Sequence, residues 1–175
     1  MLIVNLLVLI AIIFLLLMLS AVWPPDSPWA PWWRTNKKTA KAICDLAKIN
    51  SKDVVYDLGC GDGEVLLKAS QLGAKGVGIE IDPLRYWIAK LRIRLGNAED
   101  KISIKRNNFF NEDISKASVV IVYLIPKTLS RLKIKFLKEL KPGVRIVSYR
   151  YEMDLPLIAY DKDNSLRVYK IIKST

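Results

Sequence analysis

Three alternating glycines, Gly59, Gly61 and Gly63, follow a short run of β-branched and apolar residues that includes Val54 and Val55. An apolar helical pattern begins directly after them, so the stretch predicts a strand, a tight turn and a helix. Glycine permits positive φ and lets a ligand approach bare backbone, while the N–H groups of the new helix point into the same crevice. The turn therefore favours a ligand with a flat body and an anionic end.

An acidic residue, Glu80, ends the next predicted strand, seventeen positions after Gly63. One strand-helix-strand unit places a ribose-binding acid about 20 residues beyond such a turn. The turn reads Asp-x-Gly-x-Gly-x-Gly from Asp57, which differs from the Gly-x-Gly-x-x-Gly fingerprint of dinucleotide-binding proteins. A nicotinamide cofactor is therefore not favoured.

Residues 57–63, Asp-Leu-Gly-Cys-Gly-Asp-Gly, and residues 76–82, Gly-Val-Gly-Ile-Glu-Ile-Asp, resemble the first two motifs of the seven-strand S-adenosylmethionine-dependent methyltransferases. The resemblance implies that the glycine turn lies under the methionine part of S-adenosyl-L-methionine and that Glu80 binds both ribose hydroxyls. The cofactor-binding residues it implies here are Asp57, Gly59, Cys60, Gly61, Gly63, Glu80 and Ile81.

A polar and aromatic stretch, residues 107–110, follows the predicted third strand, residues 101–105. Ligands of open α/β sheets bind beyond the carboxyl ends of the strands, so this stretch should border the same crevice. Many methyltransferases have an acid here for the adenine amino group, and this chain resembles the variant with asparagine. Asn108 would then accept from adenine, with Phe109 against the purine. The alternative is a polar loop with two phenylalanines in the core.

Charge and composition narrow the chemistry. The 175 residues have a formal net charge of +11, which favours an anionic neighbour, either nucleic acid or an anionic bilayer. Two cysteines and no histidine disfavour zinc coordination, so no metal is predicted. The lack of histidine also excludes every mechanism that needs an imidazole base.

Residues 1–22 are apolar except for Asn5 and Ser20, and no charge occurs before Asp26. About 20 apolar residues can cross a bilayer as a helix. A cleaved signal peptide is the alternative, but the start has no Lys or Arg and no Ala-x-Ala site precedes Trp23. We expect a retained single-pass anchor. The basic residues that follow it predict a cytoplasmic catalytic domain, because positive flanks stay inside.

Residues 23–35 form a Pro- and Trp-rich juxtamembrane segment, in which residues 24–33 cannot be helical because they contain four prolines. One interpretation is a plain linker whose tryptophans lie in the lipid headgroup layer. The other is that the segment folds over the cofactor and brings Thr35 into the site. Small lysine methyltransferases have a Pro-x-x-Pro-Thr-type segment here, which Ala30-Pro31 and Thr35 loosely resemble.

Residues 36–175 predict one α/β domain, with five strands that alternate with helices and a closing antiparallel hairpin. The resemblance implies a Rossmann-like, mostly parallel seven-strand methyltransferase sheet in the order 3-2-1-4-5-7-6. The whole fold is then this domain preceded by one transmembrane helix.

The end of the predicted fourth strand, residues 117–124, should face the methyl acceptor. An Asn/Asp-Pro-Pro-Tyr motif, found here in methyltransferases of nucleobase and glutamine amino groups, is absent. In-line displacement mainly requires an aligned nucleophile and a dry site. A lysine amine, with a reference pKa of about 10.4, must first lose its proton, which burial and like charge promote. Tyr123 is our candidate for lining this pocket; an ordinary strand-end aromatic is the alternative.

Residues 35–172 resemble most closely the small protein-lysine methyltransferases, both compact archaeal enzymes and the membrane-anchored mitochondrial enzymes that act on the ATP synthase c-subunit and on adenine nucleotide translocase. The resemblance implies a protein substrate with an accessible lysine, with membrane-embedded proteins among the candidates. Methylation of RNA or of a lipid amine is an alternative activity. An inactive, membrane-tethered cofactor-binding scaffold is an alternative of a different class.

Overall fold

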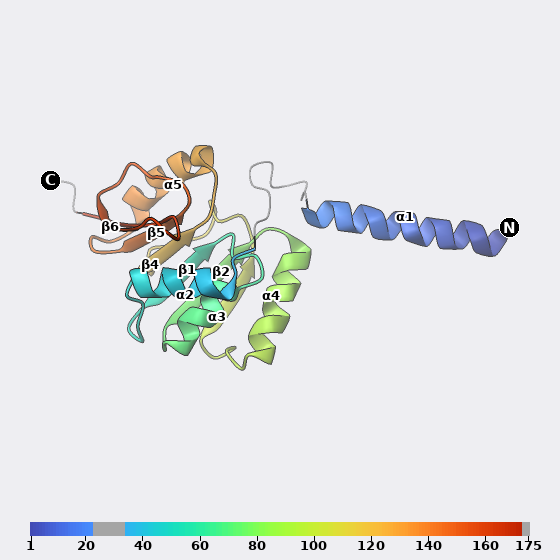
Figure 1. The fold of residues 1–175 in the computed structure, drawn as a ribbon, viewed down its shortest axis with the longest axis horizontal. Helices are drawn as coiled ribbons and strands as arrows, with labels where there is room; N and C mark the ends of the chain where they lie inside the picture. The colour runs from blue at the N-terminus through green and yellow to red at the C-terminus, as the bar shows by residue number, and fades with distance from the viewer. Residues whose placement is uncertain (23–33, 173–175) are drawn as a thin grey trace.

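The computed structural model describes residues 1–22 and 34–172, except for the side chains of residues 2 and 19–22. The predicted juxtamembrane segment, apart from Arg34 and Thr35, and the last three residues lie outside the described residues. The elements in chain order (Figure 1) are α1 (Leu2–Val22), α2 (Lys37–Leu46), β1 (Val54–Leu58), α3 (Glu64–Gln71), β2 (Lys75–Glu80), α4 (Pro83–Leu95), β3 (Ile102–Arg106), β4 (Val119–Val122), α5 (Pro126–Glu139), β5 (Arg145–Tyr149), β6 (Leu157–Asp161) and β7 (Leu166–Lys170).

The strands form one seven-stranded sheet in the order β3-β2-β1-β4-β5-β7-β6. The first five strands run parallel, and β7 pairs antiparallel with both β5 and β6. This confirms the predicted α/β fold and its strand order. Central β4 is buried at every position, as expected of a parallel strand covered on both faces.

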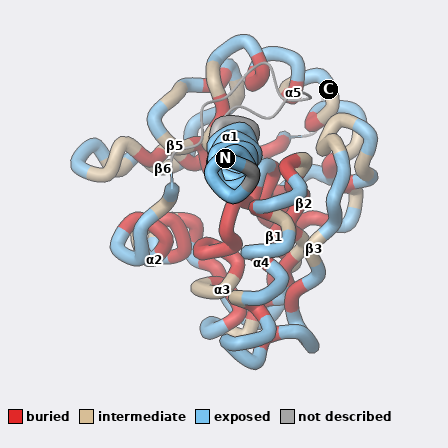
Figure 2. Tube along the Cα trace, turned by 90° about the vertical axis from the view of Figure 1, so that its right-hand side faces the viewer, coloured by how far each residue is buried: buried red, intermediate tan, exposed pale blue. Residues whose placement is uncertain are grey.

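Two apolar cores lie on opposite faces of the sheet. Residues of α2, α3 and α4 pack in one core, and residues of α5 and of the loop before β4 pack in the other. Figure 2 shows the buried residues in red along the strands and on the inner sides of the helices, with the outer sides exposed. The sheet is therefore held between two layers, and its strand ends are fixed in position.

Two helix starts on one face of the sheet are set by local hydrogen bonds that the sequence signals. The Asn36 side chain accepts from the Thr39 N–H at 2.8 Å at the start of α2. The Asp82 side chain accepts from the Arg85 N–H, also at 2.8 Å, and Pro83 is the first residue of α4. Both caps fix how the chain enters a helix beside the glycine turn.

Two details differ from the sequence prediction. Strand β4 is shorter than predicted, so Tyr123 lies just beyond its carboxyl end, where it borders the ligand crevice. The apolar spacing of residues 126–140 predicts that Leu137 faces the core, but it is 56% exposed. It lies one residue past buried Phe136, and a step of one residue turns it away from the stripe that Leu129 and Leu132 form.

The N-terminal apolar run forms the helix α1 over most of the predicted anchor. Within residues 1–22 and 34–172, however, no helix satisfies the length and hydropathy requirements for crossing a membrane. The transmembrane part of the predicted fold is therefore not supported.

Candidate functional site

The glycine turn between β1 and α3 has the backbone conformation predicted for it. Gly59, Gly61 and Gly63 have φ values of +84°, +56° and +77°, which residues with side chains rarely adopt. The N–H groups of Gly59 and Cys60 both donate to the Ile79 carbonyl, at 2.8 and 3.1 Å. These bonds fix the turn to the end of β2, so the two predicted motifs form one structural unit.

Glu80, at the end of β2, holds the turn in place through hydrogen bonds to its carboxylate. One of its carboxylate oxygens accepts from the Gly61 N–H and the other from the Asp82 N–H, each at 2.9 Å. Burial raises the pKa of Glu80, and these two N–H groups together with the charge of Arg85 oppose the rise. A carboxylate can accept about four hydrogen bonds, so capacity remains for two more donors from the cleft.

Asp57, at the end of β1, is a buried acid in the same cleft. Its pKa is raised from 3.8 to about 7, mainly by burial and further by the charges of Glu80 and Asp62. A buried acid among other acids is stabilised as a carboxylate when a cation binds beside it. This part of the cleft therefore favours a positively charged ligand group.

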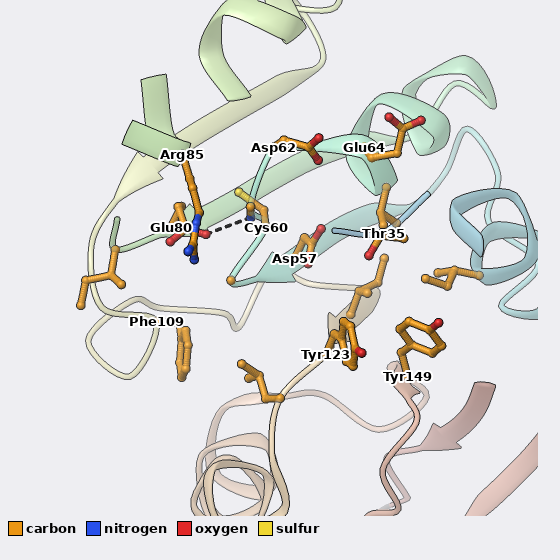
Figure 3. Close-up of a pocket in the computed structure, with 17 residues that line it drawn as sticks. Thr35, Asp57, Cys60, Asp62, Glu64, Glu80, Arg85, Phe109, Tyr123 and Tyr149 are labelled. Atoms are coloured by element: carbon orange, nitrogen blue, oxygen red, sulfur yellow. Dashed lines mark hydrogen bonds between the residues drawn. The ribbon is translucent and has the colours of Figure 1, made fainter. Parts of the chain in front are cut away.

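These side chains line one cleft above the carboxyl ends of β1, β2 and β4, with a volume of about 880 Å³ that includes its open mouth. In Figure 3, Glu80, Arg85 and Phe109 lie toward one end of it. Tyr123 and Tyr149 lie side by side away from them, and Asp57 lies between the two groups. The cleft thus has a polar and aromatic end for a nucleoside and a second aromatic end.

Most of the predicted site residues meet in this cleft. The predicted residues that line it are Thr35, Asp57, Gly59, Cys60, Gly61, Glu80, Ile81, Phe109 and Tyr123. Gly63 does not line it; instead Gly63 starts α3 and faces Ala89, which a Cβ would approach to 3.6 Å. Asn108 does not line it either, because its amide oxygen accepts from the Phe110 N–H at 3.0 Å in a local turn. Its contact with adenine stays a prediction.

An ion-pair network that the sequence did not predict lies over the glycine turn. Asp62 pairs with Arg34 at 2.7 Å and with Arg92 of α4 at 2.6 Å, and Arg92 also pairs with Glu64. Asp62 belongs to the first motif and Glu64 follows it directly, but the arginines are 28 to 30 positions away from these acids and have no sequence signature. Arg34 precedes Thr35, so its ion pair accounts for Thr35 lining the cleft.

The second aromatic end of the cleft was only half predicted. The ring centroids of Tyr123 and Tyr149 are 4.4 Å apart, and their planes make an angle of 48°. The Arg150 guanidinium lies 5.7 and 5.6 Å from the two centroids. Burial raises the pKa of Tyr123, against the opposing charge of Arg150. Tyr149 ends β5, which pairs with β4, so the strand order could have indicated it.

A parallel sheet with a glycine turn, a buried acid at the end of the second strand and an antiparallel closing hairpin defines a nucleotide-binding domain of the methyltransferase class. Comparison with known proteins narrows this class. The family model described as the ANTKMT methyltransferase domain matches residues 57–155. The chain belongs to this family and is an S-adenosylmethionine-dependent methyltransferase.

Two similar curated proteins are lysine methyltransferases by name. A "Protein-lysine N-methyltransferase" of Saccharolobus islandicus is 39% identical over 128 residues, which are 72% of this chain and 80% of that protein. A lysine N-methyltransferase of Mus musculus, named for the ATP synthase c-subunit, is 24% identical over 115 residues, 65% of this chain but 47% of the mouse protein.

A similar solved structure is named for RNA rather than for lysine. It is an RNA methyltransferase from Salinibacter ruber in complex with S-adenosyl-L-homocysteine, with a TM-score of 0.77 and 30% identity. The similarity covers 82% of this chain and 96% of that one.

The residues of the cleft fit S-adenosylmethionine. Glu80 has acceptor capacity for two ribose hydroxyls, and the nearby Phe109 ring suits a purine. The amino and sulfonium groups of the cofactor are cations, which match the buried acid Asp57. When bound, the cofactor supplies a methyl group activated by its sulfonium.

Proposed function

We propose that this enzyme transfers the methyl group to the side-chain amine of a lysine in a protein. The names of the two curated relatives support the acceptor. The observation that carries the proposal is the Tyr123 and Tyr149 pair, at the part of the cleft away from Phe109. Aromatic faces attract ammonium groups, and a ring pair at this position can receive an extended lysine side chain.

The pocket sets the protonation of the incoming amine through opposing effects. The acids of the cleft favour the ammonium form, while burial between the rings favours the neutral amine. The net charge of +11 lies mostly outside the cleft, whose deep residues include Asp57 and Glu80. A cation next to the acceptor end is Arg150, whose guanidinium lies within 5.7 Å of both ring centroids. Arg150, rather than the overall charge, supplies the like-charge effect that lowers the pKa of the amine.

We further propose that residues 1–22 anchor the enzyme in a membrane, with the catalytic domain cytoplasmic and a membrane protein among its substrates. Residues 3–18 of α1 are apolar except for Asn5, and all of them are exposed. A row of exposed apolar side chains of this length is stable in lipid but not in water. Retention of the full chain in membranes after alkaline carbonate washing tests the anchor, and protease protection tests the orientation.

RNA is the second candidate acceptor, because the Salinibacter ruber structure is named for it. The full chain should be incubated with tritiated S-adenosylmethionine and with membranes, total RNA or extracted lipid in separate reactions. We expect label in protein, recovered as methylated lysine after acid hydrolysis. Label in RNA or in the organic extract would overturn the lysine proposal, and tight cofactor binding without any label would indicate a scaffold. Glu80→Ala, which should weaken cofactor binding, is the matched control that should lower the label.

A further inference from the structure

Helix α4 is apolar on both sides, although only one side faces the domain. Its inner side buries Ile93 in the core and Ala89 against Gly63 of the glycine turn. Its outer side carries five large apolar residues that are between 39% and 74% exposed, here called the α4 ridge: Leu84, Trp87, Ile88, Leu91 and Leu95. Their spacing of i, i+3, i+4, i+7 and i+11 places them in one stripe along the helix.

The α4 ridge differs from the outer side of α5. On α5, the exposed apolar residues are Ile134 and Leu137, and they stand among many lysines and an arginine. Scattered apolar residues are normal on a protein surface, whereas a continuous stripe indicates a surface that binds something. Within the described residues, nothing covers the α4 ridge.

The charged residues of α4 itself are all positive. The sequence of α4 contains no acidic residue, and Lys90 and Arg94 are exposed. The Lys90 ammonium lies 5.6 Å from the ring centroids of both Tyr86 and Trp87, so its stem follows the apolar surface while its charge stays at the edge. A helix with an apolar stripe, a tryptophan and flanking Lys and Arg residues suits the interface of an anionic bilayer.

We propose that the α4 ridge lies on the surface of an anionic membrane, with Trp87 and Leu91 among the lipid headgroups and upper acyl chains, and with Lys90 and Arg94 at the phosphates. This contact is additional to the anchor proposed for residues 1–22. A second copy of the chain fits less well, because a symmetric contact of two α4 ridges would bring four positive charges together without a balancing acid.

The inference gives α4 two functions on its two sides. Arg85, on its inner side, lines the cofactor cleft, and Arg92 pairs with Asp62 and Glu64 of the glycine turn. When the outer side lies on lipid, the cleft is held at a fixed height and orientation above the membrane. The enzyme would then present its acceptor end to lysines close to the bilayer. This inference rests on the proposed lysine methylation and specifies where its substrate lysines lie.

The native cysteines make a direct test feasible. Cys44 and Cys60 are buried, and burial raises the pKa of both thiols, so they should not be labelled in the folded protein. Leu91→Cys, on the α4 ridge, and Leu137→Cys, on α5, introduce thiols at positions of matched exposure, 58% and 56%. Each full-length variant is labelled with bimane and incubated with phosphatidylcholine vesicles containing phosphatidylglycerol and a nitroxide-labelled lipid.

We expect the lipid nitroxide to quench bimane at Leu91→Cys, and iodide in the water to quench it about threefold less than in detergent. Bimane at Leu137→Cys should show neither change. Equal behaviour of the two positions overturns the proposal. The proposal is also overturned if bimane at Leu91→Cys is shielded from iodide in detergent and light scattering gives twice the mass of one chain. That result would assign the α4 ridge to contact with a second copy.

Charge reversal tests the choice of anionic lipid. Lys90→Glu/Arg94→Glu, made in the Leu91→Cys background, should lower lipid quenching about tenfold on vesicles with phosphatidylglycerol, and high salt should do the same to the parent. Quenching that persists unchanged would exclude an electrostatic contact with lipid. A free lysine-peptide substrate reads the proposed activity separately, since its methylation should not depend on these two charges.

Discussion

The two ends of the cleft are built in different ways. The cofactor end consists of the glycine turn and Glu80, held by backbone N–H groups within one strand-helix-strand unit, β1-α3-β2, and the residues just after it. The acceptor end consists of side chains, Tyr123 and Tyr149, which come from two strands and meet through sheet pairing. The first end is fixed by a local motif and suits one constant ligand. The second can change with two residues and suits different acceptors.

The largest effect should come from removing Glu80. Glu80→Ala loses the acceptors of the Gly61 and Asp82 N–H groups and the proposed ribose contact together. Hydrogen bonds to a charged group contribute about 1.5 to 3 kcal/mol each, so cofactor affinity should fall at least about tenfold. Titration calorimetry with S-adenosyl-L-homocysteine measures it. Unchanged affinity would remove Glu80 from the cofactor end.

Asp57 should oppose folding while it favours the cofactor. Its pKa is about 7 in the folded state and 3.8 in an unfolded chain. At pH values between these two, the folded protein therefore binds more protons than the unfolded chain. The free energy of unfolding therefore falls as pH rises from about 4 to 7, by at most about 4 kcal/mol for three pKa units. Above pH 7 the full cost remains.

Asp57→Asn should remove that cost and a contact of the cationic cofactor. Without ligand, its denaturation midpoint should exceed that of the wild type by an amount that grows between pH 4 and 7 and then stays constant. At pH 8 its cofactor affinity should be about tenfold lower, since a charge-assisted contact is lost. A variant that is less stable than the wild type at pH 8 would contradict the assigned pKa.

The same contrast explains how much the sequence could predict. Asp57 and the turn lie in the first motif and Glu80 in the second, so their meeting needed only the one strand-helix-strand unit that joins the two motifs. Tyr149 became a site residue only through the pairing of β4 with β5, and Arg92 only through the packing of α4. Asn108 was assigned by its place in a motif, but the local turn that uses its amide oxygen could not be seen from residue types.

Substitutions at the acceptor end should change turnover without changing cofactor affinity. Tyr123→Phe keeps the ring that contacts Tyr149 but removes the hydroxyl, so kcat should fall several-fold to about tenfold while cofactor affinity stays unchanged. Tyr123→Ala, which also removes the ring face, should fall further. Single-turnover methylation with saturating cofactor measures the chemical step. Wild-type rates in both variants would return Tyr123 to an ordinary strand-end aromatic.

The smallest effect should come from the ion pair between Arg34, at the entry to the domain, and Asp62 of the glycine turn. The Arg34 side chain is 59% exposed, so solvent screens the pair and it contributes about 1 kcal/mol or less. Arg34→Gln should weaken cofactor binding by less than about fivefold, as calorimetry would measure. The difference in cofactor affinity between Arg34→Gln and the wild type should shrink in high salt, because salt already weakens the exposed ion pair in the wild type.

Arg92→Gln is the matched comparison for Arg34→Gln. Arg92 is 23% exposed and bridges Asp62 to Glu64, so its loss should weaken cofactor binding more and depend less on salt. If Arg34→Gln proves as damaging as Arg92→Gln, then Arg34 holds Thr35 over the cofactor more tightly than its exposure implies. The cofactor end would then extend beyond its sequence motif, and the contrast between a local end and an assembled end would no longer hold.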